Sequence, residues 1–528
     1  MKSRLSIIII LSFLFATIAF SQDKPHSIAN KAIYDLLDEL SNDHIIDLNS
    51  VVKPFSRLFI ANALSRADSL RENLSPRQQK ELDFYLKDFG KEFNEGKEWD
   101  RRKDLFYYRD HLFTLTVNPV LGGEAFFNGN GNATYWRNGA EAWAYVGKWS
   151  FFASLRDNHE NPLLGRPEYL TKREGGHIKV GTDWSEMQGG VSYAWEWGSA
   201  ALVKDRLQWG SGYNGSNIFG GHTPTFFRIR LHIKPVEWFG FNYFHGWLNS
   251  MVVDSSRSYW VTNSYGTDYR EVYHRKYVAA NIFSFQPFKK LWLSAGNSII
   301  YSDYDFHPVY LIPLLFYKSV DHMYNSGIDN MNSQMFIDIS SRQLKHLHLY
   351  GTMFIDELSV SRITVPDEFN FFSYKAGFRL SNFPLSDLSL TAEFTYTMPL
   401  VFRHYVPTLT FETNLFNMGH YLRDNSRECY IALEYRPVRA SVIRLWFTDA
   451  IRGPDYTELG TDRLGNPLLE TVEWHNTTVG LNASYQLIND LHLWLSVVGS
   501  NITGREDWTS PFFFGRNTTF NVGITFGY

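Results

Sequence analysis

The chain has 528 residues, of which 44% are hydrophobic and 20% charged, a balance that excludes a disordered tail or a fibrous repeat. The formal net charge of -4 argues against a nucleic-acid partner, because nucleic-acid-binding proteins are usually basic. Aromatic residues reach 17% and the mean hydropathy is -0.27, which excludes a bundle of membrane-spanning helices and suits strands that are apolar on one face only. The single cysteine, Cys429, excludes a disulfide framework and a multi-thiolate metal site.

The N-terminus carries the features of an export signal. Lys2 and Arg4 precede an apolar run over residues 5–20, and the small residues Ala19 and Ser21 stand at the -3 and -1 positions of a cut before Gln22. The run is shorter than the ~20 residues that a spanning helix needs, and no cysteine follows the cut to carry a lipid anchor. We therefore expect residues 1–21 to be a signal peptide and the mature chain to function outside the cytoplasm.

Residues 22–104 have helical periodicity. Ile28, Ala32, Leu36 and Leu40 recur at helical spacing, and Ser75-Pro76 is typical of a helix cap followed by proline at the first helical position. This pattern predicts three or four short helices that form a periplasmic leader ahead of the next region. The leader is too short to be the mixed α/β plug of a TonB-dependent transporter, but it could contact a periplasmic partner.

From residue 105 to residue 528 the hydrophobic period changes to two. In the last strand Phe520, Val522 and Ile524 alternate with Asn521 and Gly523, as expected when one face meets lipid and the other a watery lumen. A soluble sandwich predicts the same alternation, but not the terminal aromatic Tyr528, which resembles the targeting strand of outer-membrane barrels. The pattern predicts an all-β transmembrane barrel of about 16–18 antiparallel strands, with the polar side chains of each strand pointing inward.

Several motifs resemble those of the Wzi-like capsule-assembly family. Residues 205–219 read DRLQWGSGYNGSNIF, and Pro224 and the strand start FRIR at residues 227–230 follow. The same family is also resembled by three shorter segments, at residues 53–57, 307–313 and 330–332. One position departs from the family pattern, since Ser211 stands where the family often carries proline. The resemblance implies an outer-membrane β-barrel with N-terminal helices that binds or tethers capsular polysaccharide and assists capsule assembly. It implies no enzymatic activity and no cofactor. The implied partners are surface polysaccharide, outer-membrane lipid and the barrel-insertion machinery.

Candidate glycan-binding residues lie in and after residues 205–219, which we call the glycine-rich segment. Sugar rings bind to flat aromatic faces, and acidic sugars bind to bidentate donors, which favours extracellular loops around an arginine-lined mouth. Two alternatives remain open: a tight turn that closes a strand pair, and arginines that form internal ion pairs with lumen acids such as Glu393, Glu412 or Glu434. The candidates are Arg206, Trp209, Tyr213, Asn214, Arg228 and Arg230.

Other side chains favour structural interpretations. Membrane barrels carry aromatic girdles at both interfaces, and we expect one here rather than a sugar platform. The girdle candidates are Trp136, Trp143, Trp149, Trp184, Trp195 and Trp197. His346 and His348 share a strand face but have no third ligand in reach, so we expect no metal. The motifs Gly-x-Ser-x-Gly and His-Glu-x-x-His are absent, and this argues against an enzyme. A diffusion porin or transporter is the main alternative function.

Overall fold

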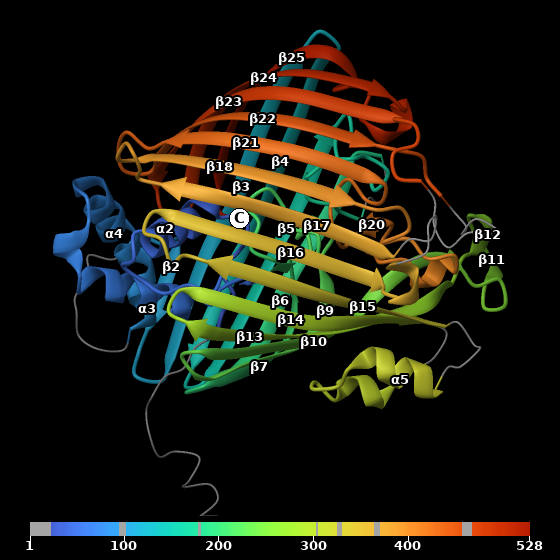
Figure 1. Cartoon of the computed structure of the whole chain (residues 1–528), viewed down its shortest axis with the longest axis horizontal. Helices are drawn as coiled ribbons and strands as arrows, with labels where there is room; N and C mark the ends of the chain where they lie inside the picture. The colour runs from blue at the N-terminus through green and yellow to red at the C-terminus, as the bar shows by residue number, and fades with distance from the viewer. Residues whose placement is uncertain are drawn as a thin grey trace, which may run out of the picture.

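The computed structural model describes residues 23–93, 102–177, 181–302, 305–324, 330–363, 370–456 and 467–528. Its main feature is a closed barrel of antiparallel strands (Figure 1). The predicted signal peptide, residues 1–21, lies outside the described residues. Within the described ranges, no helix is both long enough and apolar enough to cross a membrane.

Eighteen strands close the barrel in the part of the chain that is described, which confirms the upper end of the predicted range. Each strand pairs with the strands before and after it in the wall, and the last strand closes the cylinder on the first through Phe520↔Phe127 to Phe526↔Leu121. The strands are β3 (Phe113–Asn128), β4 (Gly131–Val146), β5 (Trp149–Asn161), β6 (Asp183–Trp195), β7 (Gly198–Asp205), β9 (Phe226–Val236), β10 (Phe239–Val253), β13 (Tyr273–Phe288), β14 (Leu291–Ser302), β15 (Met331–Ser341), β16 (Leu347–Glu357), β17 (Phe371–Ser381), β18 (Leu388–Thr397), β21 (Ser426–Tyr435), β22 (Ser441–Arg452), β23 (Trp474–Ile488), β24 (Leu491–Gly504) and β25 (Gly515–Phe526).

Shorter elements decorate this wall. β2 (Phe106–Arg109) pairs with β3 beyond the end of β25. A hairpin of β11 (Tyr259–Asn263) and β12 (Gly266–Arg270) extends from one end of the barrel, and helix α5 (Tyr317–Tyr324) lies outside it (Figure 1). Two further pairs are β1 (Val52–Lys53) with β8 (Gln208–Trp209), and β19 (Glu412–Thr413) with β20 (Phe416–Asn417).

The two ends of the barrel differ. One end has short turns, such as Gly147-Lys148 and Lys289-Lys290, and the N-terminal helices pack against it (Figure 1). We call this the short-turn end. Most connections at the other end are long, among them residues 206–225 and 398–425, and we call it the long-loop end. Bacterial outer-membrane barrels have the same asymmetry, with short periplasmic turns and longer extracellular loops.

The outer wall is apolar, as the alternation predicted. In β25, Phe520, Val522 and Ile524 are 52%, 49% and 49% exposed, whereas Asn521 between them points inward and is buried. The same pattern recurs in β17, β18, β23 and β24, where exposed rings and aliphatic chains face outward. A wall of this kind is stable only against lipid, because soluble monomers rarely expose contiguous apolar surface of this size.

Within its described residues, 23–93 and 102–104, the leader folds as three α-helices around its own apolar core. They are α2 (Lys31–Asn42), α3 (Arg57–Asp68) and α4 (Pro76–Phe89). The Ser75 hydroxyl accepts a hydrogen bond from the Gln78 amide while the Gln78 side chain bonds the Ser75 N–H, and Pro76 occupies the first turn. The cap predicted at Ser75-Pro76 is therefore confirmed, as a reciprocal capping box.

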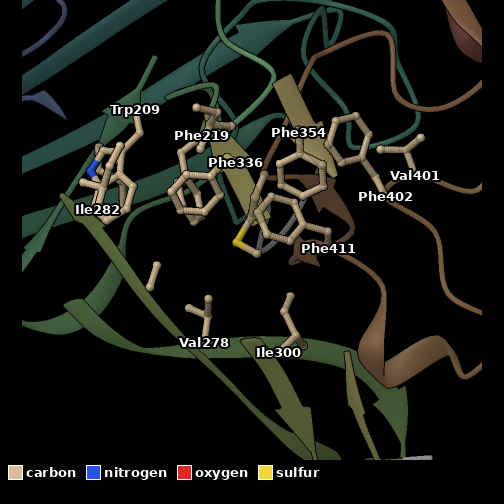
Figure 2. Close-up of a cluster of buried hydrophobic side chains, with 14 of the residues drawn as sticks. Trp209, Phe219, Val278, Ile282, Ile300, Phe336, Phe354, Val401, Phe402 and Phe411 are labelled. Atoms are coloured by element: carbon tan, nitrogen blue, oxygen red, sulfur yellow. The ribbon is translucent and has the colours of Figure 1, made fainter. Parts of the chain in front are cut away.

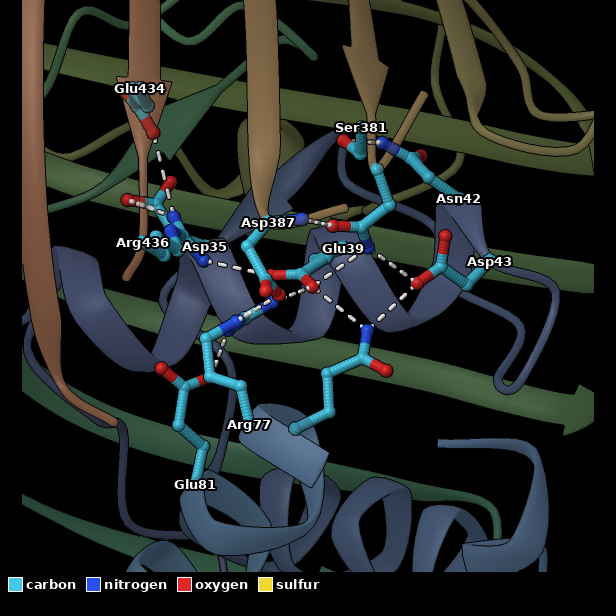
Figure 3. Close-up of polar contacts among 12 residues, drawn as sticks. Asp35, Glu39, Asn42, Asp43, Arg77, Glu81, Ser381, Asp387, Glu434 and Arg436 are labelled. Carbon is cyan, nitrogen blue, oxygen red and sulfur yellow. Dashed lines mark hydrogen bonds and ion pairs between the residues drawn. The ribbon is translucent and has the colours of Figure 1, made fainter. Parts of the chain in front are cut away.

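Helix α2 is joined to the short-turn end by buried ion pairs. Asp38 contacts Arg342 at 2.6 Å, and Glu39 contacts Arg436 at 3.0 Å. Glu39 also pairs with Arg77 of α4, which bonds Asp387 in a wall turn, so one network links two leader helices to the barrel (Figure 3). Buried charges persist only when they are paired, and this network fixes the position of the leader.

The lumen contains an apolar core, which the sequence pattern did not predict. Val278, Ile282 and Ile300 point inward from β13 and β14 and pack against Phe219 and Phe411 from the long connections (Figure 2). The expectation of a uniformly polar, watery lumen is therefore wrong for this sector. Loops from the long-loop end fold back into the barrel and need an apolar wall to pack on.

Candidate functional site

The glycine-rich segment folds into the lumen rather than outward as an extracellular loop, so its predicted position is corrected. Gln208 and Trp209 form β8 and pair with Lys53 and Val52 of the leader, and the Gly210 amide bonds the Val51 carbonyl at 2.7 Å. The segment therefore joins the leader to the wall from inside.

Trp209 is a core residue of the lumen. Only 3% of it is exposed, and its ring contacts Phe219, Phe244 and Phe336 with centroid distances of 5.1 to 5.9 Å (Figure 2). All three contacts have edge-to-face geometry, which aromatic pairs favour. In this position the indole presents no open face to a sugar, and it contributes to the site only by holding the segment in place.

Tyr213 and Asn214 are anchored by one carboxylate. Glu393 on β18 accepts hydrogen bonds from the Tyr213 amide at 2.6 Å and from the Asn214 amide at 3.1 Å, and it pairs with Lys375. The Tyr213 hydroxyl bonds His348 Nδ1 at 2.7 Å. These contacts give the turn a fixed shape, because charge-assisted bonds to backbone amides are among the stronger hydrogen bonds.

The predicted arginines meet carboxylates, as the internal ion-pair interpretation proposed. Arg206 contacts Glu186 at 2.8 Å, Arg228 pairs with Asp205, and Arg230 pairs with Asp23 at the start of the leader. These acids differ from the three suggested from the sequence. Glu434, for example, pairs with the arginines of β17, β22 and the turn between β21 and β22.

Arg206, Tyr213 and Asn214 line a cavity of about 640 Å³ inside the barrel, whereas Trp209, Arg228 and Arg230 lie outside its lining. The opposite side of this chamber is formed by wall strands β3–β6 and β22–β25, which contribute Tyr135 and Trp184 among others. The structure thus brings three of the six predicted residues together around one space. We call this space the lumen chamber.

Charges of both signs line the lumen chamber. Arg206 and Lys172 face it, as do Glu174 and Glu186. Burial alone would raise the pKa of Glu174, but the guanidinium groups of Arg206 and Arg156 hold this pKa at about 2. The carboxylate therefore stays ionised at neutral pH and neutralises the arginines. The chamber is a charge-balanced polar space with aromatic walls rather than an anion funnel.

The predicted tryptophan girdle is only partly present. Trp136, Trp149 and Trp197 are 48%, 46% and 49% exposed on the outer wall. Trp143 is a correction: it is 3% exposed, and the Lys24 ammonium of the leader lies 3.8 Å from its ring centroid. Trp184 is a second correction, because it lines the lumen chamber. Strand polarity alone did not distinguish inward from outward tryptophans.

A second aromatic surface lies at the long-loop end and was missed from the sequence. Trp260, Tyr265 and Tyr269 in and around the β11–β12 hairpin are 68%, 97% and 41% exposed, and Trp260 packs beside Tyr269 across the strand pair. Tyr259, which is 56% exposed, precedes Trp260 in the strand and points to the opposite face. The alternation YWVTN–SYGTDYR around the Asn263–Gly266 turn was the available signal. We call the exposed rings of Trp260, Tyr265 and Tyr269 the hairpin platform.

The fold and the site define a closed membrane-type barrel whose lumen is occupied by its own leader and loops. No protein-family model matches the chain, and none of the curated proteins matches it. Among solved structures, the chain is similar to Wzi of Escherichia coli, an outer-membrane protein involved in group 1 capsule assembly and described as a carbohydrate-binding β-barrel. The TM-score is 0.59 at 13% identity, over 94% of this chain and 99% of Wzi.

A second similar structure is OccD3 (OpdP) of Pseudomonas aeruginosa, with a TM-score of 0.43 and 11% identity over 78% of this chain and 90% of OccD3. The likeness to Wzi extends over nearly the whole of both chains, and the resemblance expected from the sequence motifs is confirmed as a shared fold.

Proposed function

We propose that this protein is a non-enzymatic outer-membrane barrel that binds or tethers surface polysaccharide at its long-loop end and assists capsule assembly. The hairpin platform is the observation that carries the proposal, because exposed flat rings stack on the CH faces of pyranose sugars. The shared fold with a carbohydrate-binding barrel supports the same function.

The occupied lumen favours a tether over a diffusion porin. The leader strand β1 pairs with β8 inside the barrel, and the apolar core spans the space between the loops and the wall (Figure 2). A diffusion pore needs a continuous water-filled path, which this packing narrows. In planar bilayers we expect the full chain to give no steady current, whereas open-channel currents would favour the porin.

The lumen chamber supplies a second contact region in this proposal. Arg206, Tyr213 and Asn214 line it and would contact a glycan end that reached the chamber. Trp209, Arg228 and Arg230 would act indirectly, because their packing and ion pairs hold the segment that carries the other three.

The hairpin platform allows a direct test. Replacing Trp260 and Tyr265 with alanine should weaken binding of the purified protein to capsular polysaccharide isolated from the bacterium that produces the protein. Biolayer interferometry measures this binding. Trp136→Ala is the matched control, because Trp136 is also exposed but lies on the lipid-facing wall. Equal binding by the double variant and the wild-type chain would refute the platform, and failure of the wild-type chain to bind would refute the function itself.

A further inference from the structure

The connection between β14 and β15 folds over the outside of the barrel. Its described part, residues 305–324, includes helix α5, which lies beyond the wall in Figure 1. Tyr310, Tyr317 and Val320 of this segment pack on Ala279 and Ile299 of β13 and β14. These two wall residues alternate with Val278 and Ile300, which point into the lumen, so the segment covers the lipid-facing side. We call residues 305–324 the outer flap.

Polar side chains on the lipid-facing wall lie under the outer flap. Asn281 and Asn297 stand at outward positions of β13 and β14 and are 0% and 7% exposed. The Asn281 amide donates to the Pro313 carbonyl at 2.8 Å and to the Leu315 carbonyl at 3.0 Å. Asn297 donates to Asn281 at 2.7 Å and accepts from the Tyr317 amide at 2.9 Å.

The side-chain amides of Asn281 and Asn297 satisfy hydrogen-bonding groups of the flap that lipid could not satisfy. Non-helical backbone at membrane depth is tolerated only when protein groups satisfy its polar atoms, since hydrocarbon offers no hydrogen bonds. The stretch around Pro313 and Leu315 is not helical, and its carbonyls are bonded by Asn281. In water these carbonyls would need no such partner. A second wall contact, from the Tyr243 hydroxyl to the Tyr310 carbonyl at 2.7 Å, has the same effect.

The outward surface of the flap is apolar. Leu311, Ile312, Leu314 and Phe316 are 37%, 49%, 66% and 47% exposed, and residues 308–317 contain no charged side chain. Nearer the short-turn end, the same wall strands expose outward apolar side chains as well, among them Phe285 (44%), Leu293 (40%) and Ile337 (43%). Charged residues resume only on α5, at Lys318 and Asp321.

We propose that the outer flap is a membrane-embedded lipid-binding element. Leu311, Ile312, Leu314 and Phe316 contact the acyl chains of the leaflet at the long-loop end, and Asn281 and Asn297 hold the flap on the wall. The partner is lipid hydrocarbon, because residues 308–317 of the flap carry no charged side chain, lie over the lipid-facing side of the wall and have backbone carbonyls that the protein satisfies.

Fluorescence quenching tests the proposal on the full chain. Leu314→Cys, in a Cys429→Ser background, is labelled with bimane and reconstituted into phosphatidylcholine vesicles that contain lipid with a doxyl group on its acyl chain. We expect the label to lose most of its fluorescence to the doxyl lipid and to be protected from aqueous iodide. Tyr265→Cys on the hairpin, 97% exposed, is the control and should show the opposite pattern.

Three results would overturn the proposal. Quenching of the Leu314 label by iodide but not by doxyl lipid would place the flap in water. Protection of the labelled protein from both quenchers, together with disulfide cross-linking of the unlabelled Leu314→Cys protein by an added thiol oxidant, would make a second copy of the chain the occupant. The third result concerns the variant Asn281→Leu. This substitution should release the flap and expose the Leu314 label to iodide, while the barrel still migrates as folded protein in unheated gel samples. An unchanged quenching pattern in Asn281→Leu would overturn the role of Asn281 and Asn297.

Discussion

The attachment of the leader to the wall depends strongly on one buried ion pair, and Arg342→Met should loosen it. Arg342 and Asp38 have side chains that are 2% and 4% exposed and lie 2.6 Å apart. Arg342 also donates to the Leu48 carbonyl at 3.2 Å and to Asn42 Oδ1 at 2.9 Å. The substitution therefore removes the charge partner of Asp38 together with several bonds to the leader.

The expected magnitude follows from the burial of both groups. Removing one member of a buried pair leaves an uncompensated charge and costs about 3–5 kcal/mol. Since about 1.4 kcal/mol corresponds to a factor of ten, amide protection in α2 should fall by about two to four powers of ten. The double variant Asp38→Asn with Arg342→Met removes both charges of the pair and should recover the part of that loss that comes from the unpaired Asp38 carboxylate.

Hydrogen–deuterium exchange of the full chain in detergent micelles measures this effect on peptides that cover residues 31–42. Arg505→Met is the matched control, because the Arg505–Asp507 pair is 44% and 57% exposed and should contribute less than about 1 kcal/mol. Unchanged protection in Arg342→Met would refute the reasoning. Purely additive losses in the double variant would refute the coupling between the two residues.

Two further predictions concern the loops inside the barrel. Gly210 has φ +114, and a Cβ there would clash with Ser216 Oγ, so Gly210→Ala should cost about 1–3 kcal/mol of loop stability from backbone strain, with the clash in addition, measured as exchange of residues 206–225. Gly215→Ala, at φ +96 with open space around it, separates backbone strain from the clash. Burial raises the pKa of Asp424 from 3.8 to about 6, so its carboxyl stabilises the 398–425 loop below pH 4 and loses that contribution as pH rises to 6. After correction for intrinsic exchange rates, we expect the free energy of opening of this loop to be lower at pH 7 than at pH 4 by up to about 3 kcal/mol, so that its amides exchange faster at pH 7. Asp424→Asn should abolish this difference.

The alternation of apolar and polar side chains along the strands could be predicted from the sequence because the lipid environment requires it. A one-residue change of face in β25 would place Asn521 in hydrocarbon, so the sequence there can encode only one orientation. Capping at Ser75 is similarly local, since it depends on residues three positions apart. Elements of these kinds were predicted correctly from the residues alone.

The path of the long connections could not be read in this way, because strand period says nothing about where a loop goes after the strand ends. Trp209, which the sequence offered as a candidate glycan-binding residue, is packed in the lumen core, a position that strand period could not predict. One signal was present: residues 277–283 read YVAANIF, apolar on both faces, which indicates a strand covered on both sides. Asn281 within that run was the second signal, since an amide on a lipid-facing position needs a protein partner.

The barrel wall has two sectors that differ in what covers the inner and outer faces of their strands. In the halves of β10 to β15 nearer the long-loop end, the wall is covered by protein on both faces, with the apolar core inside and the outer flap outside, so this part resembles the middle layer of a soluble domain. From β22 through β25 to β6 the wall borders lipid outside and the lumen chamber inside. Packing fixes the first sector, and substitutions there should act on stability. The lumen chamber of the second sector and the hairpin platform are the two places where the proposed glycan contacts lie, so variants that change glycan binding while leaving the fold intact should cluster there.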